Sequence, residues 1–295
     1  MNGSRHSMKL TIAFAALWAA EEALTGLVLA RYSLSQVVWL RFVFHLVLVW
    51  ALWGRRDVGL LWRTKRPLVQ FARASMLVGM PACWILGVQR GLAPSMLMSV
   101  FWLAPLLILG LAHLFLRERV SPTVWLVAAL ACGAVFALTG PHAMPRPLLL
   151  VFPLGMALCF SLYVVMARSL RTEPVAANLF YAGLGVCLLL APLIPSNWIT
   201  PTGPDLLIHA AVALLGLGSL FALERLTAAA PVSDSAPLMY LQIPFALGIG
   251  WSLGQHMPLL RTLVGMAAIG AAAFYVWQRE PHPTVRDDVA GRWVR

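Results

Sequence analysis

The hydrophobic positions of this chain gather in long runs, separated by short connections that contain Pro, Gly or charged residues. A helix needs roughly 20 mostly apolar residues to cross the hydrocarbon core of a bilayer, and the runs have about this length. The pattern predicts membrane-spanning helices at 10–30, 36–53, 68–89, 94–116, 121–140, 147–168, 174–195, 204–226, 231–254 and 258–279. We therefore expect an all-α membrane protein with ten transmembrane helices.

The amino-acid composition favours the same class. Apolar residues make up 60% of the 295 residues and charged residues only 11%, whereas a soluble domain carries about 25% charged residues to cover its surface. The lipid bilayer is therefore the expected partner of most of the surface. The four cysteines lie inside predicted spans without the spacing of a disulfide framework or a metal site, which is typical of small apolar side chains in helices; they are Cys83, Cys132, Cys159 and Cys187.

The formal net charge of +11 is compatible with nucleic-acid binding, but Lys and Arg are spread over short loops instead of forming one patch. In membrane proteins such an excess marks the cytoplasmic loops. With the N-terminus inside, 17 of the 22 basic residues fall on the cytoplasmic side, and the outer side keeps Arg31, Arg41, Arg90, Arg146 and Arg261. We expect a multi-pass protein of a bacterial-type inner membrane with both termini in the cytoplasm and no nucleic-acid partner.

The two halves of the chain match each other at an offset of 137 residues. The matched positions are Ala93-Pro94 with Ala230-Pro231, Arg41 with Asn178, and Gly133 with Gly270. Five spans is an odd number, so a second copy enters the membrane in the opposite orientation. We predict a first five-helix repeat at 1–140, an inverted repeat at 141–280 and a cytoplasmic tail at 281–295. Inverted repeats are characteristic of secondary transporters with a site near the midplane, although channels and some enzymes are also duplicated.

Several predicted spans contain proline, which removes one backbone hydrogen bond from a helix. The residues are Pro81, Pro105, Pro153, Pro192, Pro237 and Pro244. The freed carbonyl groups must be satisfied by neighbouring helices or by a water-filled cavity. Each proline is interpreted either as a kink that shapes packing or as part of a cavity wall.

Three strings converge on one known pattern. They are WLRF at 39–42, GMPACWILGVQRGLAPSMLMSVFWLAPLLILGLAHLFLRERVSP at 79–122 and LFALERLTAAAPVSDSAPLMYLQIPFALGIGWSLGQHMP at 220–258. In these strings the chain resembles the EamA-type carriers of the drug/metabolite transporter superfamily. The resemblance extends over nearly the whole chain. Pro105, Glu118 and Gly133 match the proline, glutamate and glycine of that family's repeat, whereas His256 stands where the second repeat would carry the glutamate. RGLAPSM and NWITPTGPDLL are similar to the S-adenosylmethionine-uptake and riboflavin-type branches.

The motifs of common enzymes are absent from the sequence. It contains no H-E-x-x-H, no G-x-S-x-G and no P-loop, and its histidines lack the spacing of metal ligands. We therefore expect neither an enzyme nor a metal or cofactor site. A membrane enzyme or a lipid-moving protein remains the less favoured alternative.

Glu21 and Glu22 lie in the middle of the first predicted span. A charged residue at the centre of a membrane helix costs roughly 2.5–3.5 kcal/mol on insertion scales, so it usually faces a partner or a wet cavity. Neighbouring residues point about 100° apart on a helix, so at most one of the two can point directly into a cavity. Trp18, Glu22 and Thr25 share one face of the helix, and Glu21 lies beside Trp18 as well. The pair is either a site for a substrate ammonium group or a proton, or a structural ion pair with Arg41 in the second span.

Aromatic and polar residues inside the other spans form a second tier of candidates, namely Trp84, Trp102, Tyr163, Tyr240 and Gln242. The resemblance implies that spans one, three, four, six, eight and nine surround a central cavity. These side chains would then hold a planar or cationic substrate by stacking or cation–π contact. The alternative is packing between helices.

Three charged residues near the predicted cytoplasmic ends of spans are candidates for a gate. Arg73 lies about one turn inside the third span, where we expect it to snorkel to the headgroups. Glu118, at the end of the fourth span, is expected to form an ion pair at a helix end or loop. Asp234 lies beside Ser233 just inside the ninth span and serves either as a polar gate or as a helix cap.

These features together predict a secondary transporter that moves a small metabolite by alternating access. The expected substrate is amino-acid-like or nucleoside- and cofactor-like, as S-adenosylmethionine and riboflavin are, with protons as the candidate coupling ion. A channel on the same scaffold is the main alternative. The sequence leaves open the substrate, the direction, and whether the protein is a monomer or a homodimer.

Overall fold

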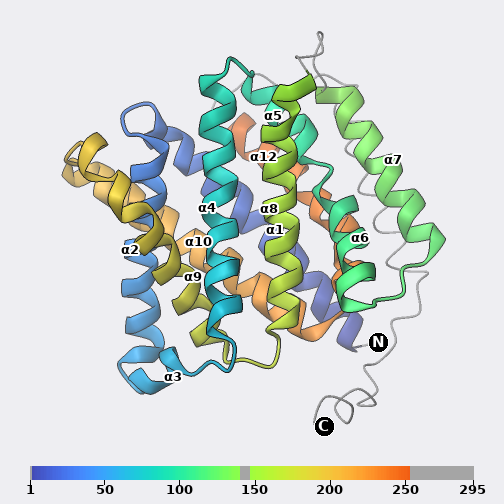
Figure 1. Cartoon of the computed structure of the whole chain (residues 1–295), viewed down its shortest axis with the longest axis horizontal. Helices are drawn as coiled ribbons and strands as arrows, with labels where there is room; N and C mark the ends of the chain where they lie inside the picture. Colours follow the sequence, from blue (N-terminus) through green and yellow to red (C-terminus); the bar gives the residue numbers. More distant parts are fainter. Residues whose placement is uncertain (1, 140–146, 253–295) are drawn as a thin grey trace.

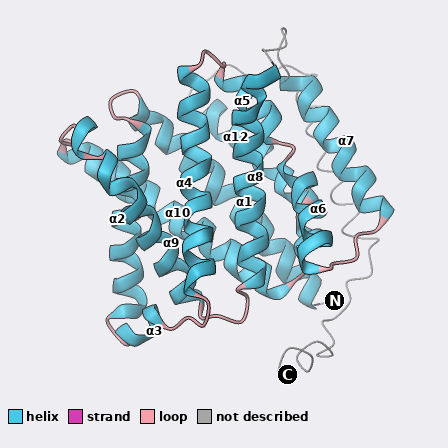
Figure 2. Cartoon of the chain, viewed as in Figure 1, coloured by secondary structure: helices cyan, strands magenta, loops and turns pink. Residues whose placement is uncertain are grey.

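The computed structural model describes residues 2–139 and 147–252 (Figure 1). The described residues form helices joined by loops, with no strand among them (Figure 2). The predicted span at 258–279, the predicted tail at 281–295, Gly270 and His256 lie outside them. The expected all-α class is confirmed for the part of the chain that the structure describes.

The helices follow the predicted spans closely. They are α1 (Asn2–Leu29), α2 (Leu34–Val49), α3 (Val58–Trp62), α4 (Pro67–Gln89), α5 (Pro94–Phe101), α6 (Ala104–Leu116), α7 (Pro122–Thr139), α8 (Val151–Ser169), α9 (Val175–Leu190), α10 (Gly203–Ala229), α11 (Val232–Ser235) and α12 (Gln242–Ser252). Short π- or 3₁₀-helical segments extend or link them at Trp50–Gly54, Pro147–Leu150, Ala191–Leu193, Pro195–Asn197 and Pro237–Leu241.

Seven helical segments of the described residues are long and apolar enough to cross a membrane. They are Ser7–Leu29, Leu34–Gly54, Pro67–Gln89, Pro94–Leu116, Pro147–Ser169, Val175–Leu193 and Gly203–Ala229, and a shorter apolar helix covers Pro122–Phe136. Large apolar side chains such as Leu68 and Leu148 are more than four-fifths exposed. Such exposure suits contact with lipid, and the chain is a multi-pass membrane protein.

Two predicted spans are interrupted where proline falls inside them. The span at 94–116 breaks between α5 and α6, just before Pro105, and the span at 231–254 breaks between α11 and α12 around Pro237. Proline lacks the N–H that would continue the hydrogen-bond ladder, and its ring displaces the preceding turn. Pro81 lies inside α4 without ending it. The breaks place irregular backbone in the protein interior, where neighbouring helices cover it.

The helices pack in pairs that join distant parts of the sequence. α1 runs along α10, and α4 runs along α8 (Figure 1). α2 packs against α10, α9 packs against α4, and α2 and α9 touch each other. The aromatic core lies between α1, α5 and α8, where the Trp18 ring stacks on Phe160 with centroids 5.0 Å apart and meets Phe101 edge-on.

Glycines set the distance between α4 and α8. A Cβ atom on Gly79 of α4 would lie 2.7 Å from the Sγ of Cys159 on α8, and a Cβ on Gly155 of α8 would lie 2.8 Å from the Sγ of Cys83 on α4. Each helix therefore offers one glycine to the thiol of the other. Small residues at such crossings allow helix backbones to approach closely.

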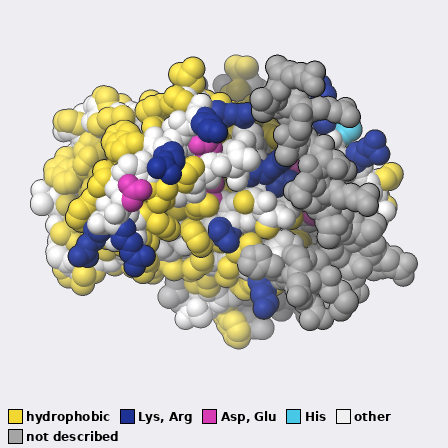
Figure 3. All heavy atoms as spheres, turned by 90° about the horizontal axis from the view of Figure 1, so that it is seen from below, with side chains coloured by type: hydrophobic (Ala, Val, Ile, Leu, Met, Phe, Trp, Pro, Cys, Tyr) yellow, Lys and Arg dark blue, Asp and Glu magenta, His cyan; other side chains and the backbone are white. Residues whose placement is uncertain are grey.

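Basic residues concentrate at one end of the bundle, which carries α3 and the start of the chain (Figure 1). The exposed basic side chains in its loops are Arg55, Arg56, Arg63, Lys65, Arg66, Arg117, Arg119 and Arg171. Figure 3 shows this face, with basic side chains scattered among apolar ones. The loops of the opposite end carry exposed Arg31 and Arg90. The orientation of the chain in the membrane stays a prediction.

Candidate functional site

A cavity of about 310 Å³ lies between the helices that carry most of the sequence-predicted site residues. Its walls come from α1, α2, α4, α5, α8 and α10. The polar and aromatic lining consists of Phe14, Trp18, Glu21, Glu22, Thr25, Arg41, Phe42, Trp84, Phe160, Tyr163 and Ser219, and the remainder is mostly leucine, valine and methionine. The volume suits a small organic molecule.

Both carboxylates of α1 line the cavity, but they have different partners. Glu21 is 4% exposed and forms an ion pair with Arg41 of α2, whose side chain is 19% exposed. Glu22 is partly exposed, and its Oε2 accepts a hydrogen bond of 2.6 Å from the amide of Gln242 on α12. Among the described residues no cation pairs directly with Glu22. Glu22 is therefore the carboxylate available to a positive group in the cavity.

Of the two interpretations of the carboxylate pair, the ion pair with Arg41 is formed by Glu21, and Trp18, Glu22 and Thr25 all line the cavity. Both carboxylates line the cavity, so the expectation that at most one of them points directly into it stays a prediction. Glu21 touches the cavity beside its ion-pair partner, whereas Glu22 faces it with an amide as its partner.

Aromatic rings from several helices contribute to the apolar part of the lining. Trp18, Trp84 and Tyr163 line the cavity as predicted. Tyr163 is 1% exposed, and its buried hydroxyl has no hydrogen-bond partner among the described residues. A ligand in the cavity can use this hydroxyl, while the rings offer faces to a flat or positively charged group.

Trp102 and Tyr240 were predicted as cavity walls, but the structure places them behind the wall. Both are buried, their ring centroids are 5.9 Å apart, and the Tyr240 hydroxyl donates to the Trp102 carbonyl over 3.0 Å. The Trp102 ring lies 6.3 Å from that of Trp18, so it supports a lining residue. Trp102 sits at the break between α5 and α6, where this bond from Tyr240 satisfies a carbonyl at the interrupted helix.

The cavity has two unlike ends. Its lining reaches Gly26, Leu29 and Leu34 at the connection between α1 and α2, where Leu29 is 38% exposed. At the other end Tyr163 meets Arg73, with the guanidinium carbon 5.0 Å from the ring centroid. Beyond that point the polar side chains are fully buried.

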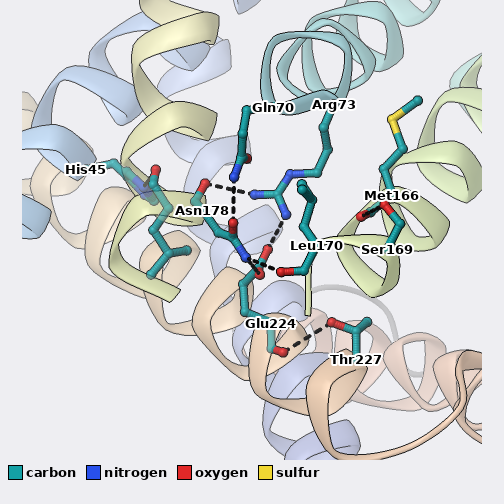
Figure 4. A network of polar contacts seen from close by, with 10 residues as sticks. His45, Gln70, Arg73, Met166, Ser169, Leu170, Asn178, Glu224 and Thr227 are labelled. Atoms are coloured by element: carbon teal, nitrogen blue, oxygen red, sulfur yellow. Dashed lines mark hydrogen bonds and ion pairs between the residues drawn. The ribbon is translucent and has the colours of Figure 1, made fainter. Parts of the chain in front are cut away.

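Arg73 lies at the centre of a buried network between α4, α9 and α10 (Figure 4). Its Nη1 donates to Glu224 over 2.5 Å, and its Nη2 donates to the Asn178 carbonyl over 2.8 Å. The Asn178 amide donates to the second Glu224 oxygen over 2.7 Å and accepts from Gln70 over 2.6 Å. The side-chain exposures of Arg73 and Glu224 are 0% and 1%. The network lies next to Tyr163, at this end of the cavity.

The expectation that Arg73 snorkels to the headgroups is wrong. The side chain turns inward because Glu224 on α10 supplies a buried counter-charge, and a paired charge can remain buried where an isolated one cannot. Sequence reasoning also missed the roles of Gln70, Asn178 and Glu224. Glu224 stands in a Leu-Glu-Arg string near the end of α10, and that string was the available signal.

A second polar layer lies nearer the basic end of the bundle. Glu118, after α6, pairs with Arg168 of α8 at 3.5 Å and accepts hydrogen bonds from the backbone N–H groups of Val232 and Ser233 in α11. Arg168 also donates to the Thr227 carbonyl over 2.6 Å. The expected ion pair of Glu118 is confirmed, with Arg168 as its partner. The carboxylate that caps α11 is Glu118, whereas Asp234 adds negative charge near Arg168.

Comparisons with known proteins agree with this architecture. No model of a known protein family matches the chain. S-adenosylmethionine uptake transporters of Rickettsia felis and Rickettsia bellii are each 24% identical over 83% of this chain, covering 80% and 81% of their own length. A riboflavin transporter of Brucella anthropi is 24% identical over 60% of this chain and 65% of its own. The chain is a homologue of these membrane transporters.

The relatives bear the name of transporters and not of enzymes, and their branch is the one that the sequence strings predicted. A solved crystal structure shares the fold, with a TM-score of 0.76 and 19% sequence identity over 92% of this chain and 96% of that one. Membership of the EamA-type family in particular stays a prediction.

Proposed function

We propose that the protein is a secondary transporter that carries a small metabolite across a bacterial inner membrane by alternating access, and that it is not an enzyme. The observation that carries the proposal is a single continuous arrangement: a charged aromatic cavity that ends on a buried polar network. A carrier needs a site that is reachable from one side and closed on the other. The described conformation then opens toward the α1–α2 connection and is closed at the basic, cytoplasmic end.

The two-repeat architecture is part of the proposal, and helix packing supports it. An offset of 137 residues relates α1 to α8, α2 to α9 and α4 to α10. Under this exchange the α1–α10 contact becomes the α8–α4 contact, and the α2–α10 contact becomes the α9–α4 contact; all four occur. Gln36, which bonds the backbone of Ile199, corresponds to Glu173, which bonds the backbone of Lys65. Such reciprocal contacts are expected of two copies of one unit.

The gate that we propose consists of the two polar layers. Arg73 belongs to the first repeat and bonds Glu224 and Asn178 of the second. Glu118 of the first repeat bonds Arg168 and α11 of the second. Relative motion of the repeats must break these contacts, and it would give access to the cavity from the basic end. Asp234 would act through its attraction to Arg168.

The charges of the cavity favour a substrate that is positively charged and carries a flat ring. Glu21, Glu22 and Arg41 together carry one net negative charge when ionised, and aromatic rings surround them. S-adenosylmethionine has a sulfonium, an ammonium, a carboxylate and a flat adenine, so its charges and shape fit this lining. The relatives named for its uptake support this substrate over riboflavin.

Counterflow in proteoliposomes tests the proposal. Labelled S-adenosylmethionine should enter vesicles preloaded with the unlabelled compound faster than it enters empty vesicles, because a carrier reorients faster when it is loaded. Riboflavin and neutral amino acids provide the specificity controls, and a pH gradient tests proton coupling. Uptake that preloading does not accelerate would indicate a channel, and binding without any movement would contradict transport.

A further inference from the structure

Arg41 occupies a narrow slot in the surface of α10, next to Gly216. A Cβ atom on Gly216 would lie 2.6 Å from Nε, 2.8 Å from Nη2 and 3.0 Å from Cζ of Arg41. Real Cβ atoms essentially never approach other heavy atoms to less than 3.0 Å, so any side chain at position 216 must displace the guanidinium group. The glycine thus admits the flat face or edge of Arg41 to the helix backbone.

The other contacts of Arg41 show what holds its guanidinium group in place. Its Nη1 faces Glu21 in the ion pair, and its guanidinium carbon lies 5.0 Å from the centroid of the Phe42 ring. Its Nε is buried and has no hydrogen-bond partner among the described residues. Hydrogen bonding to Nε therefore does not hold the group in place. Its position depends on the charge of Glu21, the contact with the Phe42 ring and the room left by Gly216.

We infer that Gly216 is a positioning residue for the substrate site: it holds the Arg41 guanidinium against α10 and on Glu21, which leaves Glu22 free for the positive group of the substrate. This inference rests on the proposed function. A side chain at position 216 pushes the guanidinium away from α10 and into the cavity. There it takes up space and partly neutralises Glu22. Gly216 acts through Arg41 and needs no contact with the substrate.

Gly218 provides a matched control on the same helix. A Cβ on Gly218 would lie 3.2 Å from the Cδ1 of Leu17, the end of a flexible side chain that is not part of the cavity lining. Alanine in place of glycine favours a helix by a similar amount at both positions. The difference between Gly216→Ala and Gly218→Ala therefore isolates the contact with Arg41.

The first test needs no transport. Thermal unfolding of the purified full chain in detergent is compared for Gly216→Ala in the wild-type background and in an Arg41→Ala background. We expect Gly216→Ala to lower the melting temperature when Arg41 is present, and to leave it unchanged or raise it when Arg41 is absent. Where Arg41→Ala alone prevents folding, Glu21→Gln/Arg41→Ala removes both charges and serves as the background. Equal effects in both backgrounds would overturn the inference.

The second test measures the site. In proteoliposomes, Gly216→Ala should raise the KM for S-adenosylmethionine about tenfold and leave the maximal rate within about twofold, which is the signature of lost binding rather than lost folding. Gly218→Ala should stay within about twofold of wild type in both quantities. Arg41→Lys, whose ammonium lacks the planar fork, should reduce the effect of Gly216→Ala.

The two possible failures can be told apart. If wild-type protein neither binds nor moves S-adenosylmethionine, riboflavin or amino acids, the proposed function fails, while the melting temperatures still decide whether Gly216 positions Arg41. If wild-type protein transports and Gly216→Ala behaves like Gly218→Ala in both tests, the proposed function stands and the role of Gly216 is refuted.

Discussion

Two arginine–glutamate pairs lie at the two ends of the polar interior, and they differ in what they connect. Arg41 and Glu21 both belong to the first half of the chain and line the cavity, where the Arg41 side chain is 19% exposed. Arg73 and Glu224 come from opposite halves, and their side chains are almost completely buried. The pair inside one half can survive a movement of the halves relative to each other, whereas the pair between halves cannot.

The two ion pairs have similar chemistry but are suited to different roles. A charge pair that must remain intact through a transport cycle is suited to shaping a site, and a pair that must break is suited to closing one. Glu22 lies between these cases, because Gln242, its partner, comes from the second half. Loss of that bond on movement of the halves would change the environment of the carboxylate that faces the substrate.

The largest effect is expected from Arg73→Met. The variant leaves the Glu224 carboxylate buried without its counter-charge, and breaking a buried pair in this way costs about 3–5 kcal/mol of stability. Chemical or thermal unfolding in detergent measures the loss. Arg73→Met/Glu224→Gln removes both charges and should recover much of it. A double variant as unstable as the single one would show that the pair itself is not the source.

A somewhat smaller effect, and one on transport instead of stability, is expected from Glu22→Gln. The glutamine keeps the shape of the side chain and its bond to Gln242 but removes the charge offered to the substrate. Because charge-assisted hydrogen bonds are about twice as strong as neutral ones, uptake of a cationic substrate should fall by about 100-fold, or about 2.7 kcal/mol. Uptake at the wild-type rate, with an unchanged pH profile, would remove Glu22 from the site.

Glu118→Ala probes the second polar layer of the proposed gate. The variant loses the ion pair with Arg168 and the two bonds from α11, and we expect about 1–3 kcal/mol less stability, the usual cost of leaving buried partners unsatisfied. Glu118→Gln keeps an acceptor for the α11 amides and should lose less. An equal loss in both variants would assign the whole effect to the ion pair.

The smallest effect is expected from Gln242→Ala, which removes a neutral donor from Glu22. One such bond contributes about 1 kcal/mol, so stability should change little while the KM for a cationic substrate shifts by no more than about fivefold. Saturation kinetics in proteoliposomes measure this shift. A loss as large as that of Glu22→Gln would mean that the amide itself binds the substrate.

The sequence predicted the helices well because membrane spans depend on the length of apolar runs, which a chain displays directly. The breaks near Pro105 and Pro237 follow from the chemistry of proline, and the pairing of Glu21 with Arg41 follows from their similar depth. The sequence could not predict the partner of Arg73, because Glu224 is 151 residues away and meets Arg73 only where α4 approaches α10. The position of Arg73 near the end of its span suggested snorkelling, whereas Glu224 on another helix draws the side chain inward.

Side-chain direction at the helix breaks was equally hidden. Trp102 and Tyr240 stand where helical periodicity is lost, so counting residues could not show that both turn into the protein behind Trp18. Gly216 carried no signal in the sequence beyond being small. Its meaning depends on Arg41, which arrives from a different helix.

The crossing of α4 and α8 gives the molecule a chemical reporter of its own. Gly79 leaves just enough room for the thiol of Cys159, and Gly155 for that of Cys83. Both thiols are only partly exposed and each packs against a glycine of the other helix, so a maleimide should react with them faster when the two helices separate. Alkylation of these native cysteines therefore records how often the helices separate, and the rate can be followed by mass spectrometry without any engineered label.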